Sequence, residues 1–216
     1  MKSNRSLKIA GYILIGLAVI AFGAVTLHST MLINEMSNMR SESNSGLLNR
    51  YEEQVDRVET RSKDGLQISA WRFKTPEPKG IIMVIHGMHG QDATSLLDFG
   101  SFFHQQGYES FCIDLRAHGK SQGNKIGFGY TEKRDVRALL DWIIRQPSYQ
   151  DEDIILYGIS MGGATAINAA VDREEVKKVI SVSSFYSYED VFIHFMEQRG
   201  RSEERRVGKE CATGCR

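Results

Sequence analysis

The sequence predicts an α/β fold with a mainly parallel, doubly wound sheet, preceded by one transmembrane helix. Several short runs are apolar throughout, as in strands that are covered on both faces. Stretches with helical spacing separate these runs, and an alternation of buried strands and helices gives a parallel sheet between two layers of helices. An uncharged segment near the N-terminus predicts the membrane helix.

The uncharged segment, residues 9–27, reads IAGYILIGLAVIAFGAVTL. At about 1.5 Å of rise per residue, a helix of this length covers roughly 28 Å, close to the thickness of the hydrocarbon core of a bilayer. Residues 1–8 hold three basic residues and no acidic one, so the positive-inside rule predicts a single-pass protein of the cell membrane with a cytoplasmic N-terminus. A signal peptide cleaved near residues 21–23 and a buried core helix are the alternatives.

The rest of the chain divides into three parts. Residues 28–50 are polar and rich in Ser and Asn, and we interpret them as a stalk before a domain at 51–200. Residues 201–216 begin RSEERRVGKEC, which resembles the in-frame translation of a sequencing-library adapter, so we expect a non-native tail. Outside this tail Cys112 is the only cysteine, and one buried thiol forms neither a disulfide nor a metal site.

The domain contains a predicted hairpin, four buried strands and three helices. Segments 55–62 and 66–73 alternate apolar and polar residues around a turn signal, which predicts the antiparallel hairpin. Apolar runs predict buried strands at 81–86, 108–115, 153–158 and 176–184. Helical spacing predicts helices at 95–107, 131–146 and 161–171.

Composition excludes some functions. Lys plus Arg and Asp plus Glu are balanced at 27 each, so the charge gives no reason to expect a nucleic-acid partner. Apolar content of 41% and charged content of 25% are ordinary for a globular protein. No pattern implies a metal or an organic cofactor, and we expect none. The sequence does not predict the oligomeric state.

Residues 158–163, GISMGG, place Ser160 between a predicted buried strand and a predicted helix. This is the setting of a nucleophile elbow, a sharp turn that holds a serine hydroxyl exposed above the sheet. Gly158 and Gly162 lack a Cβ where the chain turns and where the helix packs against the strand. The motif alone does not exclude a Ser-Gly turn without chemistry.

Two further motifs follow the preceding strands. HGMHG, at 86–90, ends one strand and leaves the backbone N–H of Met88 free to point at a substrate. Together with the N–H of Met161, directly after Ser160, it is expected to form an oxyanion hole. DLRAHGKSQG, at 114–123, ends the next strand.

The order HGMHG, GYESFCIDLRAHGKSQG, GISMGG resembles the α/β-hydrolase superfamily over residues 55 to about 195. It is most similar to the branch of serine aminopeptidases, monoacylglycerol-lipase-like and lysophospholipase-like enzymes and small membrane-tethered hydrolases. The resemblance implies an α/β-hydrolase fold and a serine hydrolase that cleaves carboxylic esters, or amides, through an acyl-enzyme on Ser160. The positions that it implies to be structural are His86, Gly87, Asp114, Arg116, His118 and Gly119.

The groups that would activate Ser160 are harder to place. A serine hydroxyl needs a base within hydrogen-bond reach, itself oriented by a carboxylate. The resemblance implies that this acid and histidine follow Ser160, each after a later strand. Only one further strand is predicted, and the only later histidine, His194, lies in an amphipathic stretch that we interpret as the start of a helix. We therefore expect a fold that is incomplete at the C-terminus and a chain that is inactive as given.

The substrate stays open at this point. A small-molecule ester, a lipid or a peptide would suit the chemistry, since the fold alone does not choose among them. The alternatives are a peptidase of the serine aminopeptidase type and a non-catalytic binding or scaffold member of the fold.

Overall fold

The computed structural model describes residues 3–38, 40–41, 45–88, 92–149, 152–187, 193 and 197. His89, His194 and the predicted tail at 201–216 therefore lie outside the described residues. The chain forms two compact units, Met1–Met39 and Arg40–Arg216.

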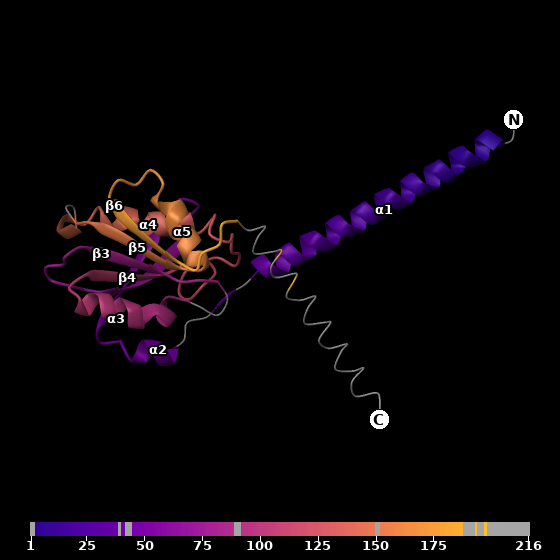
Figure 1. The fold of residues 1–216 in the computed structure, drawn as a ribbon. Coiled ribbons are helices and arrows are strands. Elements are labelled where there is room, and N and C mark those ends of the chain that lie inside the picture. The colour runs from indigo at the N-terminus through magenta and orange to yellow at the C-terminus, as the bar shows by residue number, and fades with distance from the viewer. Residues whose placement is uncertain are drawn as a thin grey trace, which may run out of the picture. The chain divides into compact units, whose positions relative to one another are not determined.

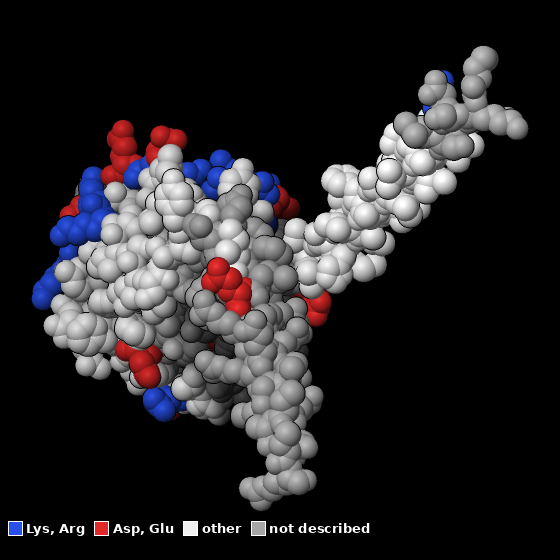
Figure 2. Space-filling view, turned by 45° about the vertical axis from the view of Figure 1, so that its right-hand side comes forward, with Lys and Arg blue, Asp and Glu red and all other residues white. Residues whose placement is uncertain are grey.

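The first unit is a single helix, α1 (Ser3–Ser37). Its stretch Lys8–Glu35 is long and apolar enough to cross a membrane, and none of its most apolar part is buried within the structure. Figure 2 shows uncharged atoms over most of the described length of this helix. Because a core helix of a soluble protein is mostly buried, the observed exposure argues against that alternative. The helix also continues ten residues beyond the predicted span, into the predicted stalk.

The second unit is built on a six-stranded sheet with the strand order β1-β2-β4-β3-β5-β6. The antiparallel hairpin of β1 and β2 is confirmed, and β2 also pairs antiparallel with β4. β4, β3, β5 and β6 are all parallel, as predicted. The strands are β1 (Val55–Arg61), β2 (Gln67–Phe73), β3 (Ile81–Ile85), β4 (Glu109–Asp114), β5 (Ile154–Ile159) and β6 (Val176–Val182).

Helices cover both faces of this sheet. α3 lies on one face, and α4 and α5 lie on the other (Figure 1). The helices of this unit are α2 (Ser45–Asn49), α3 (Leu97–Gln105), α4 (Lys133–Ile143) and α5 (Met161–Ala170), with short 3₁₀ turns η1 (Ala93–Leu96) and η2 (Pro147–Tyr149).

Strand β3 explains why the apolar runs are continuous. Ile81, Met83 and Ile85 belong to the core cluster on the side of α4 and α5. Ile82 and Val84 belong to the cluster on the side of α3. Side chains alternate between the faces of a strand, so a strand covered on both faces needs apolar residues at every position.

Residues 40–41 belong to the second unit, although the sequence predicts a stalk there. The Arg40 side chain donates to the carbonyl of Gly123 at 3.1 Å. The Ser41 N–H donates to the carbonyl of Ala117 at 3.0 Å, and the Ser41 carbonyl accepts from the N–H of Gly119 at 2.7 Å. The compact unit thus begins at Arg40, eleven residues before the predicted boundary at 51.

Candidate functional site

Ser160 lies at the turn between β5 and α5, in an unusual backbone conformation. Its φ of 55° and ψ of −120° fall in a region that residues with a Cβ rarely adopt. Such strained positions persist only where the surrounding structure holds them, and they occur often at active sites. The N–H of Ser160 donates to the carbonyl of Val182 at 2.8 Å, which ties the turn to the end of β6. The side chain is half-exposed.

The glycines of the elbow sit where the backbone segments approach most closely. A Cβ on Gly158 would lie less than 3.0 Å from the carbonyl oxygen of Gly162. A Cβ on Gly162 would lie equally close to the carbonyl oxygens of Ile85 and His86. A side chain at either position would therefore push the first turn of α5 away from the neighbouring backbone.

Both predicted oxyanion donors belong to segments that border this turn. Met161 is the first residue of α5, so its N–H has no intrahelical acceptor and lies at the positive end of the helix dipole. Met88 lies two residues beyond His86, whose carbonyl Gly162 approaches closely. Its partly buried side chain packs against the core cluster on the side of α4 and α5.

The buried residue His86 has both ring nitrogens engaged. Nδ1 lies 2.6 Å from the carbonyl oxygen of Gly87, and Nε2 accepts from the N–H of Leu115 at 3.0 Å. Burial, reinforced by the neighbouring His118, lowers the pKa of His86 to about 3, so the ring is neutral at pH 7. Since neither nitrogen is left to accept the proton of Ser160, the role of His86 is to join the end of β3 to the end of β4.

Asp114 ends β4 and fastens two loops. Its Oδ1 accepts from the N–H of Ala93 at 2.8 Å, and its Oδ2 accepts from the N–H of Lys120 at 2.9 Å. Gly119 lies so close that a Cβ there would collide with this carboxyl group. Burial raises the pKa of Asp114 to about 7, against the opposing effect of the two amide donors. The residue thereby links the loop after β4 to the turn η1, which follows the loop that carries Met88.

Arg116 ties the same loop to two further elements. Its guanidinium pairs with the buried Asp135 of α4 at 2.7 Å and with Asp64 of the β1–β2 turn at 2.8 Å. His118 lies next to His86, with ring centroids 4.6 Å apart, and its Nδ1 lies 2.8 Å from the carbonyl oxygen of Arg116. Through these contacts Arg116 and His118 hold the loop after β4 in place.

The described residues do not bring a general base to Ser160. The hydroxyl of Ser160 has no hydrogen-bond partner among them. His104 lies on the side of α3, where its Nδ1 meets the hydroxyl of Thr75 at 2.9 Å. His89 and His194 are outside the part of the chain that the structure describes. Within that part, no cluster of three or more His, Cys, Asp or Glu residues could hold a metal ion.

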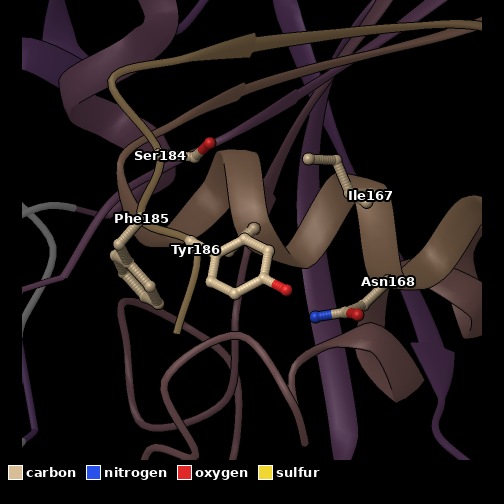
Figure 3. A pocket seen from close by; sticks show the side chains of 6 residues that line it. Ile167, Asn168, Ser184, Phe185 and Tyr186 are labelled. Atoms are coloured by element: carbon tan, nitrogen blue, oxygen red, sulfur yellow. The ribbon is translucent and has the colours of Figure 1, made fainter. Parts of the chain in front are cut away.

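A hollow of about 400 Å³ is lined by α5 and the segment after β6, and its volume is in the usual range for small-molecule pockets. In Figure 3, Ile167 and Asn168 project from α5, and Phe185 and Tyr186 come from the segment after β6. Ala164 also lines the hollow, and its N–H donates to the Ser160 carbonyl at 3.3 Å. The lining residues are Ala164, Ile167, Asn168, Ser184, Phe185 and Tyr186.

The sequence did not predict that residues 184–186 line this hollow, nor that Glu132 supports the loop before α4. The predicted strand at 176–184 ends at Val182 in the structure, so Ser184 leaves the sheet and faces the hollow. Glu132 is buried, and its carboxylate accepts from the N–H groups of Gly127 at 2.6 Å and Gly129 at 2.8 Å. An acidic residue at the start of a predicted helix, here 131–146, is a usable signal for such a loop contact, but it does not identify the partners.

Comparison with known proteins agrees with this architecture. Protein bem46 of Schizosaccharomyces pombe is 24% identical over 190 residues, which cover 86% of this chain and 63% of the relative. Thiohydrolase aneE of Aspergillus aculeatus is 30% identical over 134 residues, which cover 61% of this chain and 42% of the relative. The chain thus spans less than two thirds of the length of each of these relatives.

A solved structure of the Pyrococcus furiosus esterase Pf2001 superposes with a TM-score of 0.64 at 21% identity, covering 74% of this chain and 60% of that one. At this level of identity the likeness shows the fold. The sequence profile of the family described as serine aminopeptidase, S33, matches residues 76–207, more than half of the chain. The match includes the elbow and both preceding motifs, and it runs seven residues past the predicted end of the domain at 200. The chain belongs to this serine aminopeptidase S33 family and has the α/β-hydrolase fold.

Proposed function

We propose that the protein is a serine hydrolase that cleaves carboxylic esters through an acyl-enzyme on Ser160. The observation that carries the proposal is the strained turn, with a φ of 55° at Ser160 between a buried strand and a helix. In this reaction the Ser160 hydroxyl attacks the ester carbonyl, and the N–H groups of Met161 and Met88 stabilise the oxyanion. The alcohol leaves, and water then releases the acid from Ser160.

A base and its orienting acid have to come from outside the described residues. Support for this comes from the relatives, of whose length the chain spans 63% and 42%. β6 is at one edge of the sheet, and its apolar Val179, Ile180 and Val182 are exposed. We expect further strands of the whole protein to cover this edge and to deliver the acid and the histidine. The chain as given should then show no turnover, because loss of the base in a serine protease costs about a million-fold in rate.

The hollow lined by α5 and the segment after β6 favours an ester over a peptide with a free amino terminus. Among the described residues, its lining includes aromatic and aliphatic side chains and no Asp or Glu. An aminopeptidase needs a negative group to pair with the substrate's ammonium group, because an unpaired charge is costly to bury. A pocket of this composition instead suits an uncharged acyl chain. A peptidase of the aminopeptidase type remains the second candidate, because the family carries that description.

A fluorophosphonate probe tests the assignment of Ser160 in the protein expressed from its complete gene. The probe should label the wild-type protein and leave the Ser160→Ala variant unlabelled. Short-chain p-nitrophenyl esters should be hydrolysed faster than aminoacyl p-nitroanilides. Equal labelling of both proteins would refute Ser160 as the nucleophile, whereas faster anilide cleavage would favour the peptidase. Absence of labelling in a folded wild-type protein would favour the non-catalytic alternative.

We also propose that α1 anchors the protein in a membrane with its N-terminus in the cytoplasm. The apolar stretch Lys8–Glu35 and the basic residues before it support this orientation. Protease added to intact cells or spheroplasts should digest the hydrolase domain while α1 stays in the membrane. Protection of the domain until the membrane is opened would reverse the orientation, and release of an intact soluble domain would favour a cleaved signal peptide.

A further inference from the structure

A small basic hollow lies between the β1–β2 turn and α4, on a part of the domain that the proposed reaction does not use. Its volume is about 200 Å³. Of its seven lining residues that the structure describes, five are cationic and one is acidic. The cationic residues are Arg61, Lys63, Lys133, Arg134 and Arg137, and the others are Ala138 and Asp141.

Most of this positive charge is not neutralised within the described residues. Among these, no carboxylate forms an ion pair with Arg61, Lys63, Lys133 or Arg137. The one acidic residue of the lining, Asp141, already pairs with Arg173 at 2.6 Å. Four like charges around one hollow repel one another, and a bound anion would remove that repulsion.

Two of the three arginines, Arg61 and Arg137, are held in place by backbone carbonyls. Arg137 donates to the carbonyls of Ala169 at 3.1 Å and Val171 at 2.7 Å, at the end of α5. Arg61 donates to the carbonyl of Gly65 at 2.5 Å. These bonds restrict the side chains without consuming their charge. A site whose cations are already positioned loses less conformational entropy when it binds an anion.

We propose that this hollow binds a phosphate group. Guanidinium groups match phosphate oxygens through paired N–H donors, and lysine adds a compact point charge. The hollow also borders the first residues of the 11-residue helix α4, Lys133 and Arg134, where the positive end of the helix dipole adds to the positive potential. A phosphate monoester, which carries nearly two negative charges, gains more from four cations than a carboxylate does. The phosphate can be free in solution or can belong to the headgroup of an anionic lipid.

Titration calorimetry with inorganic phosphate tests the site in the full chain, held in a neutral detergent at constant ionic strength. The wild-type chain should bind phosphate saturably, and Lys63→Gln/Lys133→Gln should weaken binding by about tenfold, since two charges near the dianion are lost in a partly screened setting. The control variant Lys74→Gln/Lys178→Gln removes two exposed lysines outside the hollow and should bind within about twofold of wild type.

Lys133 also lies over the ring of Tyr130, at 4.3 Å, so its replacement removes a packing contact as well as a charge. The single variant Lys63→Glu, and thermal unfolding of every variant, distinguish an effect of charge on binding from an effect on folding. The proposal is refuted if phosphate produces no more heat than chloride, or if the hollow and control variants bind equally. Dihexanoyl phosphatidate identifies the source: at least tenfold tighter binding than phosphate assigns the hollow to a lipid headgroup, and equal binding assigns it to free phosphate. Ser160→Ala should bind phosphate normally, so failure of the proposed hydrolase activity leaves this test unaffected.

Discussion

Replacing Ser160 by glycine should stabilise the domain while removing the nucleophile. The φ of 55° and ψ of −120° at this residue cost about 1–3 kcal/mol for a side chain with a Cβ. Glycine relieves that strain but loses about 0.4–1 kcal/mol through the greater freedom of the unfolded chain. The hydroxyl contributes no hydrogen bond to another described residue, so little else is lost. We expect Ser160→Gly to exceed both wild type and Ser160→Ala in unfolding free energy by about 1 kcal/mol.

Urea unfolding followed by tryptophan fluorescence measures this difference in the full chain. The two tryptophans, Trp71 and Trp142, both lie in the second unit and are partly buried, so the signal reports this unit rather than α1. Phe111 packs against Trp142 at a centroid distance of 6.1 Å, which makes its emission sensitive to loss of the core. A mild detergent keeps α1 soluble at every urea concentration.

Ser148→Gly provides the matched control. Ser148 is exposed in the turn η2 and does not have a positive φ. Glycine should therefore relieve no strain there and should lower the unfolding free energy by about 0.5–1 kcal/mol. If Ser160→Gly loses as much stability as Ser148→Gly, or is no more stable than Ser160→Ala, the turn stores no strain and the argument from its backbone fails.

Two other predictions concern the support of the elbow. Gly162→Ala, whose new Cβ would press on the carbonyl of Ile85, should lower ester turnover of the whole protein by about a hundredfold, as a displacement near 1 Å can. The new Cβ of Gly163→Ala would meet the movable hydroxyl of Ser181 at 2.5 Å, the Cβ of Ser184 at 3.0 Å and, at a looser 3.2 Å, the carbonyl oxygen of Gly158. This variant should cost less turnover, and equal losses would contradict the assigned contact. The pKa of His86, about 3, lies below the unfolded value of about 6.5, so its contribution to stability is lost as pH falls below 6.5, by about 2 kcal/mol at pH 5. Urea titrations at pH 5 and pH 7 give the loss of unfolding free energy between the two pH values, and His86→Gln should reduce this loss by about 2 kcal/mol. An unchanged loss would show that His86 is charged or exposed in the folded chain.

The strands and the elbow were predictable because their signals are local. A continuous apolar run located β3, and the apolar centre of β4, Phe111 to Ile113, located that strand; the residues of both are buried at every position. The glycines around Ser160 indicated a close approach, and the structure shows what they approach: Gly162 meets the carbonyls of Ile85 and His86. Local sequence thus predicts that a side chain is excluded at a position, whereas the tertiary structure decides which atoms exclude it.

Other features depend on contacts between distant segments and could not be predicted. Residues 40–41 look like part of a polar stalk, yet Ser41 exchanges backbone hydrogen bonds with the loop around Gly119. Those bonds come from main-chain groups, which every residue carries, so composition gives no sign of them. The pocket wall at 184–186 depends in the same way on where β6 ends.

The parts of the site that the structure describes all follow from the order of the strands. β3 lies beside β5, with Ile85 opposite Gly158, so the residues that follow each strand meet at one edge of the sheet. β6 lies on the other side of β5, and the carbonyl of Val182 at its end fixes the N–H of Ser160. The nucleophile and the start of the helix that carries one oxyanion donor are therefore positioned by β3, β5 and β6. A general base would add a proton acceptor to this site, but the conformation of the turn at Ser160 does not depend on it. For that reason the strain at Ser160 is measurable in this chain whatever the source of its base.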